Sequence, residues 1–258
     1  MRLTVLGCGS TVPHPLRTSS AYWLETSGGT ILLDCSATAP HQMAEIGVAW
    51  PGLDAIWISH FHMDHVGGLG PFFAGTKHAP QMQSRTKPLT VFGPPGLEKL
   101  FDGISGVRDY KLREQPFPVS IVEIETMEKF EMVPGVEAVA MSTEHTPESH
   151  AIHIRDGDST LMYSADTGFD ERVAALGTNV GLMVLECSFV RNKPNTKHLV
   201  LKEAIHLIRK AKPGKAMLTH FYPEWDEIDF AKEIEALSPR CEVIQAEDGL
   251  RIEIADAR

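Results

Sequence analysis

The chain has 258 residues, of which 43% are hydrophobic, and its formal net charge is −10, with 24 Lys and Arg against 34 Asp and Glu. This apolar content suffices for a substantial core, and no uncharged apolar run reaches the roughly 18 residues that a membrane-spanning helix needs. The acidic balance argues against a binder of duplex nucleic acid, because such proteins gain affinity by neutralising phosphates with a basic surface.

The four cysteines, Cys8, Cys35, Cys187 and Cys241, lie far apart in the sequence, and none forms a CxxC pair. Disulfides and a thiolate zinc site are therefore not expected, and a reducing cytoplasm is the expected compartment. The N-terminal segment MRLTVLGCGSTVP has an apolar run broken by Gly, Cys and Ser. Such a run is typical of a first strand and turn, and it is unlike a signal peptide.

Short apolar, β-branched runs alternate with helical stretches along the chain, and no repeat or linker interrupts them. We therefore expect one domain over residues 1–258. The pattern predicts strands at 3–6, 21–25, 30–34, 55–59, 89–92, 119–124, 137–142, 151–154, 159–164, 181–187, 215–220 and 241–244. It predicts helices at 37–47, 66–77, 95–103, 170–176, 199–211 and 226–236.

Residues suited to chemistry recur where predicted strands end. His60 follows AIWIS, His145 follows EAVAMS, Asp166 follows STLMYS, Glu186 lies in GLMVLEC, and His220 follows KAMLT. Sheet proteins place active sites at strand ends, where loops leave a rigid scaffold. We therefore expect these side chains, which come from separate strands, to meet in one site.

The densest cluster is SHFHMDHVGGL at 59–69, which places His60, His62, Asp64 and His65 within six positions. The spacing differs from the helical HExxH motif, whose histidines need an i,i+4 relation. A spacing of two suits an extended segment that leaves a strand, and the glycines at 67–68 would let Asp64 and His65 turn toward a second point. The alternative interpretation is a polar loop after a buried strand, and we favour a metal site over it.

This motif resembles the signature of the metallo-β-lactamase superfamily, and later segments extend the likeness in the same order over essentially the whole chain. YSADTG at 163–168 resembles the strand-end aspartate of that superfamily, STEHTPESH at 142–150 its isolated histidine, and AMLTHF at 216–221 its final histidine. Within the superfamily the chain is most similar to ribonuclease Z and its short phosphodiesterase relatives. The resemblance implies an α/β fold, a four-layer αββα sandwich.

The resemblance also implies two divalent metal ions per chain, with zinc expected and manganese or iron as alternatives. The implied ligands are His60, His62 and His145 for the first ion, Asp64, His65 and His220 for the second, and Asp166 as the bridge. His150 and His153 are rivals to His145 as the ligand. We prefer His145 because it directly follows a predicted strand.

Asp64, Glu186 and His198 are the residues that the resemblance assigns to catalysis. His198 would stabilise or protonate the leaving group, and Glu186 would orient its ring. The alternatives are the start of a loop for Glu186 and an ordinary residue opening a helix for His198. The family pattern usually has Gly before this histidine, where this chain has Lys197.

A further candidate region is TVPHPLRTSS at 11–20, which resembles the first loop of the family, a loop that lines the substrate site. It contains His14, and Arg17 in it is a candidate for contact with a phosphate.

The implied function is a binuclear metal-dependent phosphodiesterase that attacks small phosphodiesters, of the cyclic nucleotide or cyclic phosphate type, with a metal-bridging hydroxide. The same site would serve a lactone, thioester or β-lactam hydrolase, a ribonuclease Z-type RNA endonuclease, or a non-catalytic metal-binding module.

The expected partner is a small-molecule phosphodiester, with no stable nucleic-acid binding and no membrane, and the resemblance suggests a homodimer. Relatives that process transfer RNA insert a long arm between the equivalents of His145 and Asp166. That interval here is filled by two predicted strands and the turn RDGDS, which leaves no room for an arm.

Overall fold

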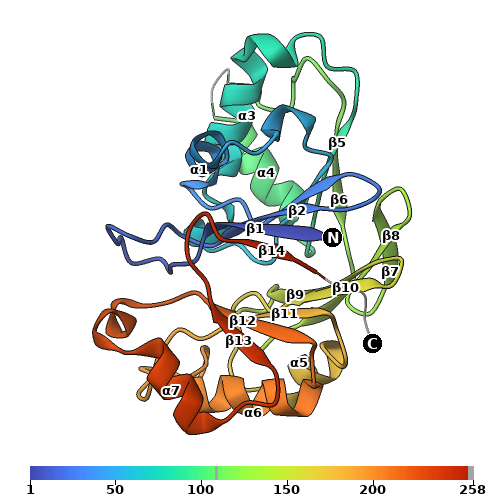
Figure 1. Ribbon diagram of the computed structural model, residues 1–258. Helices are drawn as coiled ribbons and strands as arrows, with labels where there is room; N and C mark the ends of the chain where they lie inside the picture. Colours follow the sequence, from blue (N-terminus) through green and yellow to red (C-terminus); the bar gives the residue numbers. More distant parts are fainter. Residues whose placement is uncertain (108–109, 255–258) are drawn as a thin grey trace.

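Two seven-stranded sheets pack face to face, and helices cover both outer sides (Figure 1). This arrangement comes from a computed structural model that describes residues 1–107 and 110–254. It is the four-layer αββα sandwich expected from the sequence. Within the described ranges, no helix is both long and apolar enough to cross a membrane. All four cysteines are free, as predicted.

The first sheet has the strand order β14-β1-β2-β3-β4-β5-β6. It is antiparallel from β14 to β3 and parallel from β3 to β6. Its strands are β1 (Arg2–Gly7), β2 (Ala21–Glu25), β3 (Thr30–Leu33), β4 (Ala55–Trp57), β5 (Leu89–Gly93), β6 (Val119–Glu123) and β14 (Arg251–Glu253). The helices on its outer side are α1 (Ala39–Ile46), α3 (Leu69–His78) and α4 (Leu97–Ser105), shown above it in Figure 1.

The second sheet has the order β13-β12-β11-β10-β9-β8-β7. It is antiparallel from β7 to β10 and parallel from β10 to β13. Its strands are β7 (Lys129–Val133), β8 (Val136–Ser142), β9 (His150–Asp156), β10 (Ser159–Tyr163), β11 (Leu182–Glu186), β12 (Lys215–Thr219) and β13 (Glu242–Gln245). Its outer helices are α5 (Glu171–Leu176), α6 (Leu201–Ala211) and α7 (Phe230–Leu237).

Four short helical elements complete the described part of the chain: η1 (Trp50–Gly52), α2 (Met63–Val66), η2 (Pro80–Met82) and η3 (Pro223–Glu227). The helix expected at 66–77 is therefore two helices, α2 and α3, and the one expected at 226–236 is α7 preceded by η3. Gly68, between α2 and α3, is needed for a close approach, because a Cβ atom there would lie 2.1 Å from the carbonyl oxygen of Ser36.

Two strands were not predicted, β7 and β14. Each lies at the edge of a sheet. Strand β7 has five residues, and polar and apolar residues alternate only from Lys129 to Met132, whereas β14 has three residues. Such short patterns are weak signals by themselves, and pairing with a neighbouring strand decides their conformation.

The main core lies between the sheets and is crossed by aromatic contacts. Trp57 of β4 stacks on Phe130 of β7 with ring centroids 5.9 Å apart. Tyr22 of β2 lies 5.2 Å from Tyr163 of β10, and its hydroxyl shares a hydrogen bond of 2.7 Å with Thr219 at the end of β12. These contacts tie together the strand ends from which the candidate site residues emerge.

Truncation of this core should destabilise the fold strongly. Leu24 of β2 is fully buried in it, so Leu24→Ala should lower the free energy of unfolding by about 2–5 kcal/mol through lost burial and the cavity left behind. Leu16, whose exposed fraction is 80%, is the matched control, and Leu16→Ala should change the value by less than about 0.5 kcal/mol. Urea unfolding of the metal-saturated proteins measures both, and equal effects would contradict this account of the core.

Candidate metal centre

The two sheets bring all the predicted metal ligands to one place. Among the described residues, two groups of His and Asp have ligand atoms that all lie within 4.8 Å of one another. The first group is His60, His62, His145 and Asp166, and the second is Asp64, His65, Asp166 and His220. The elements that carry them are the segment after β4, the helix α2, and the loops that follow β8, β10 and β12.

In the first group, three imidazole nitrogens point at one another. Nδ1 of His62 lies 3.1 Å from Nε2 of His60 and 3.1 Å from Nε2 of His145. Oδ2 of Asp166 lies 3.8 Å and 3.6 Å from the same two Nε2 atoms. Lone pairs that converge in this way repel one another unless a cation or a proton lies between them. The geometry is that of a cation site.

In the second group, the other oxygen of Asp166 is used. Oδ1 of Asp166 lies 3.3 Å from Nε2 of His65 and 3.3 Å from Nε2 of His220. Oδ2 of Asp64 lies 3.8 Å and 3.4 Å from these two nitrogens. One carboxylate thus presents one oxygen to each group, which is the geometry that a bridging ligand needs.

Three buried atoms of the second group, Nε2 of His65, Nε2 of His220 and Oδ1 of Asp166, have no hydrogen-bond partner among the described residues. Buried polar atoms are nearly always satisfied, so such orphans call for a missing partner. Imidazole nitrogens and carboxylate oxygens are the ligand types of zinc, manganese and iron. The residues present therefore fit divalent metal ions.

The ring atoms that point away from the centre are held by the protein. Metal-binding histidines generally donate their second N–H to an acceptor, which fixes ring orientation and tautomer. The four Nδ1 contacts of this kind are His60 to Ser59 Oγ (3.0 Å), His65 to Asp34 Oδ2 (2.6 Å), His145 to the carbonyl of Lys197 (2.9 Å) and His220 to Ser188 Oγ (2.9 Å). Each of these rings therefore presents Nε2 to the centre.

Asp34 is a candidate site residue that the sequence interpretation missed. Its carboxylate accepts hydrogen bonds from the backbone N–H and hydroxyl of Ser59, from Nδ1 of His65 and from the hydroxyl of Tyr163. Burial lowers the pKa of His65, but the charges of Asp166 and Asp34 outweigh it and raise that pKa well above its ordinary value. The signal was present in the sequence, because Asp34 ends the predicted strand TILLD as the other site residues end theirs.

Glu186 and His198 form a third group, which shares His220 with the second. Nδ1 of His198 lies 2.8 Å from Oε1 of Glu186, and further bonds to that carboxylate come from the N–H of Thr167 (2.9 Å), the hydroxyl of Ser188 (2.7 Å) and the N–H of Leu199 (3.1 Å). Burial lowers the pKa of His198, but the hydrogen bond and charge of Glu186 outweigh it and raise the pKa to about 9. His198 was expected to open a helix, but it lies in the loop before α6, which begins only at Leu201.

The backbone of the site is held in conformations that few residues adopt. Asp34 (φ 58°), Ala165 (φ 51°) and His220 (φ 61°) are all left-handed. Gly168 lies so close to the loop before His198 that a Cβ atom would be 2.1 Å from the carbonyl oxygen of Thr196. Such conformations persist only where the surrounding structure enforces them, and they concentrate at functional sites.

The remaining histidine candidates lie outside the cluster. His150 is buried in β9, and His153 lines a cavity on the outer face of the second sheet, so the structure brings His145 to the site instead of its two rivals. His14 and Arg17 both contact Asp226 of η3. Arg17 is thus already paired with a carboxylate, which does not support its expected role as a phosphate contact.

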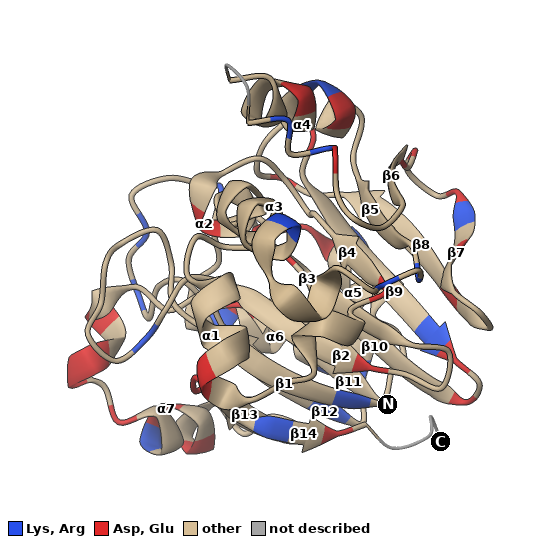
Figure 2. Ribbon diagram, turned by 90° about the horizontal axis from the view of Figure 1, so that it is seen from above, with Lys and Arg blue, Asp and Glu red and all other residues tan. Residues whose placement is uncertain are grey.

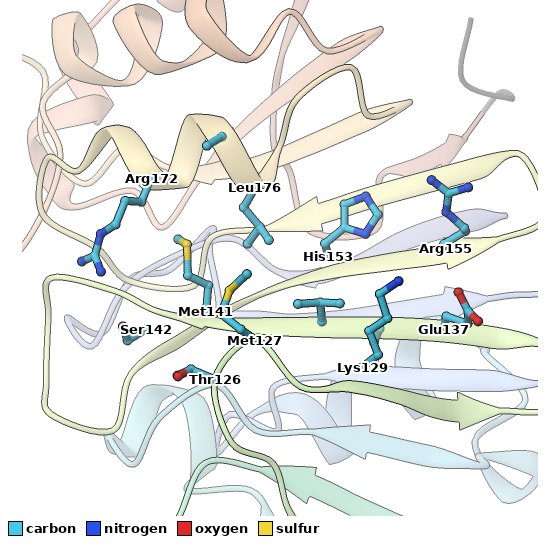
Figure 3. Close-up of a pocket in the computed structure, with 13 residues that line it drawn as sticks. Thr126, Met127, Lys129, Glu137, Met141, Ser142, His153, Arg155, Arg172 and Leu176 are labelled. Atoms are coloured by element: carbon cyan, nitrogen blue, oxygen red, sulfur yellow. The ribbon is translucent and has the colours of Figure 1, made fainter.

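One sizeable cavity is separate from this centre. It has a volume of about 880 Å³ and lies on the outer face of the second sheet, where Met141 and His153 face Arg172 and Leu176 of α5 (Figure 3). None of the clustered ligands lines it. A second cavity of about 700 Å³ adjoins the centre instead, and His145 and Lys197 are among its lining residues.

Comparison with known proteins places the chain in a family. The family model described as "Anti-Pycsar protein Apyc1" matches residues 1–239. The chain belongs to the Apyc1 family. It is 27% identical over 225 residues to the anti-Pycsar protein Apyc1 of Paenibacillus harenae, covering 86% of this chain and 90% of that protein. It is also 27% identical over 246 residues to ribonuclease Z of Mycobacterium marinum, covering 86% and 87%.

Solved structures agree on the fold. The metallo-β-lactamase fold protein YhfI from Bacillus subtilis matches with a TM-score of 0.81 and 22% identity, covering 97% of this chain and 98% of that one. The short form of human tRNase Z matches with a TM-score of 0.77 and 19% identity, covering 99% and 100%. This Apyc1 family member is therefore a metallo-hydrolase of the ribonuclease Z-like branch of the metallo-β-lactamase superfamily, as predicted.

Replacement of Asp34 should weaken metal binding without touching a ligand. In Asp34→Asn the amide would present a donor where His65, Ser59 and Tyr163 already donate, so His65 would lose its anchor. We expect zinc affinity to fall by about 10- to 100-fold, as is usual for an outer partner of a ligand. Competition with a chromophoric chelator measures it.

The matched control is Asp229→Asn, at the N-terminus of α7, where asparagine caps the helix as well as aspartate does. Its zinc affinity should equal that of the wild type. An unchanged zinc affinity in folded Asp34→Asn protein would show that Asp34 does not position His65.

Proposed function

We propose that this protein is a binuclear metal-dependent phosphodiesterase that acts on small phosphodiesters of the cyclic nucleotide type. The observation that carries the proposal is that the two carboxylate oxygens of Asp166 face two separate groups of candidate metal ligands. The hydrogen-bonded pair of His198 and Glu186 lies next to them. The arrangement offers two adjacent cation sites with a proton donor at their side. A phosphodiester needs these elements, because its anionic group must be held and its leaving oxygen protonated.

In this proposal His60, His62 and His145 would hold one ion, Asp64, His65 and His220 would hold the other, and Asp166 would contribute to both sites. Bound divalent ions would supply Lewis acidity, which polarises a phosphoryl oxygen and acidifies water. The protein keeps the two sites in place through the buried anchors of the histidines, Asp34 and Ser188 among them. Zinc is the expected ion, with manganese or iron as alternatives.

His198 is the proposed donor to the leaving oxygen. Its Nδ1 is held by Glu186, so the proton available to a substrate is the one on Nε2. The ring lies against the centre, with its centroid 4.8 Å from that of His145 and 5.5 Å from that of His220. The Glu186 carboxylate stabilises the imidazolium before the transfer and keeps the ring oriented after it.

The cyclic nucleotide class is supported by the family. The name of the Apyc1 family, anti-Pycsar, suggests the degradation of cyclic nucleotides. A fold-level likeness to a diphosphatase of the PhnP family, with a TM-score of 0.74, is compatible with phosphate ester chemistry. A cyclic nucleotide is a small phosphodiester, so the family name and the likeness to a diphosphatase are both compatible with the chemistry proposed for this site.

Stable binding of RNA is not part of this proposal. β9 and β10 are joined by a two-residue turn at Gly157 and Asp158, and no arm extends between His145 and Asp166 within this described stretch. Figure 2 shows Lys and Arg positions interspersed with Asp and Glu positions along the visible ribbon. The net charge of −10 also opposes the binding of a polyanion. The homodimer expected by resemblance stays a prediction.

An activity panel tests the function. The metal-loaded protein should hydrolyse 3′,5′-cyclic nucleotides and bis-p-nitrophenyl phosphate, and it should lose this activity on chelation and regain it with zinc or manganese. A lactone, nitrocefin and a precursor tRNA with a 3′ trailer are tested in parallel. Preferred hydrolysis of the lactone or nitrocefin would favour the alternative function as a lactone, thioester or β-lactam hydrolase. Efficient removal of the tRNA trailer at nanomolar enzyme concentration would refute the expectation that tRNA is not a substrate.

Loss of the proton donor should separate chemistry from metal binding. His198→Ala should retain its metal content but lose about 10²–10⁴-fold in kcat, the usual span for a general acid. The loss should be smaller for p-nitrophenolate than for alkoxide leaving groups, because p-nitrophenolate leaves without protonation. Elemental analysis and steady-state kinetics measure the two effects.

His206→Ala is the control, since His206 lies on the exposed side of α6 and pairs with Glu171. It should match the wild type with both leaving groups. Equal losses of His198→Ala with the two leaving groups would argue against the proposed role.

A further inference from the structure

Tyr222 lies beside the centre but has no role in the mechanism described so far. It follows His220 by two positions at the start of η3, and its ring centroid is 6.0 Å from that of His220. It is also 5.9 Å from the ring of His198. Tyr222 therefore adjoins both a proposed metal ligand and the proposed proton donor.

The position of the Tyr222 ring is fixed by its neighbours. It stacks on Phe189 with centroids 4.7 Å apart and an angle of 29° between the rings. Its backbone N–H donates to the carbonyl of Ser188, and that of Phe221 donates to the carbonyl of Cys8. A side chain held in this way loses little conformational freedom when it binds a ligand, which is what a substrate contact requires.

The hydroxyl of Tyr222 differs from those of the two buried tyrosines. The hydroxyl of Tyr22 is hydrogen-bonded to Thr219, and that of Tyr163 donates to Asp34. Tyr222 is only partly buried. Its hydroxyl makes no hydrogen bond to any residue in the described ranges. A phenol that is held rigidly at a catalytic centre, with its donor unused by the protein, is available to a ligand.

We propose that Tyr222 contacts the substrate and donates its hydroxyl proton in a hydrogen bond to a non-bridging oxygen of the phosphoryl group. The proposal rests on the phosphodiesterase function above and extends it to the means of recognition. A phosphodiester carries its negative charge on those oxygens, and a hydrogen bond to an ionised acceptor is roughly twice as strong as one between neutral groups. A neutral lactone would gain less from the same donor. Tyr222 would thus favour anionic diesters over neutral esters at a metal centre able to polarise both.

The competing explanation is that Tyr222 only packs. Its ring would then cover His198 and Phe189, and the hydroxyl would contribute nothing. Two variants separate these explanations, since Tyr222→Phe removes the hydroxyl alone and Tyr222→Leu removes the ring as well. Tyr110→Phe is the matched control, because it deletes a hydroxyl from an exposed tyrosine that is not part of the centre.

In the metal-loaded protein, Tyr222→Phe should lower kcat/KM for a 3′,5′-cyclic nucleotide by about 10- to 100-fold, the span of one hydrogen bond to a charged group. Its metal content should be unchanged by elemental analysis, and Tyr110→Phe should equal the wild type. A second measurement does not depend on turnover. Calorimetric titration of the zinc-loaded protein with inorganic phosphate should show weaker binding in Tyr222→Phe by a similar factor.

The turnover and phosphate-binding measurements distinguish a failure of the proposed function from a failure of the proposed Tyr222 contact. If the wild type cleaves no phosphodiester, the proposed function fails, and the phosphate titration still decides the role of Tyr222. If Tyr222→Phe equals the wild type in phosphate binding, and in turnover where turnover exists, the proposed contact is overturned. A loss seen only in Tyr222→Leu overturns it too, because it assigns Tyr222 to packing alone.

Discussion

The rest of the site depends on the burial of one carboxylate, that of Asp166. Burial alone would raise its pKa, but the charges of His220 and His65 outweigh that effect and hold the pKa well below the usual range. An ionised group in such a place is tolerated only if positive charge or hydrogen-bond donors surround it. Here Oδ1 has no hydrogen-bond partner in the described part of the chain. A divalent cation on each side of Asp166 would satisfy both oxygens, and the histidines lie where they would complete the two coordination shells.

The fold supplies this arrangement through its strand ends. The segments that carry the candidate ligands leave β4, β8, β10 and β12, so residues far apart in the sequence reach one edge of the sandwich. The left-handed backbone at Ala165 and His220 turns the chain sharply at two of these ends. Ala165 and His220 are both buried just beyond the ends of their strands, so the surrounding structure enforces these conformations.

The sequence was sufficient to predict the fold and the residues that the structure brings together in one cluster, because both follow from local sequence patterns. That these residues bind metal ions stays a prediction. Alternating apolar runs mark the strands, and the spacing of His60, His62, Asp64 and His65 is specific enough to imply the other candidate ligands by resemblance. The residues that hydrogen-bond to these histidines could not be predicted in the same way. Ser59 and Ser188 are ordinary residues in sequence, and only tertiary contacts show that they hold His60 and His220. Strand β7 was missed for a similar reason, since its conformation depends on pairing with β8.

Long-range pairing also changes the interpretation of charged residues. Arg17 looked available for a phosphate in sequence, yet it is paired with Asp226, which lies more than two hundred positions away. Tyr222 is the opposite case, a residue whose availability the sequence did not reveal. Nothing in its local sequence distinguishes it from a core tyrosine, and only its position beside His198 in the fold sets it apart.

Ligand sets of this kind polarise carbonyl and phosphoryl groups alike, so they do not decide which ester is cleaved. That choice belongs to the side chains around the metals. His198, hydrogen-bonded to Glu186, suits a leaving oxygen that needs a proton. The Tyr222 phenol beside it, which makes no hydrogen bond to the described residues, suits an acceptor with negative charge. Both requirements are met by a phosphodiester with an alkoxide leaving group, whereas a lactone meets only the first. The selectivity of this centre for phosphodiesters is therefore expected to reside in the loop of His198 and the segment after His220, not in the metal ligands.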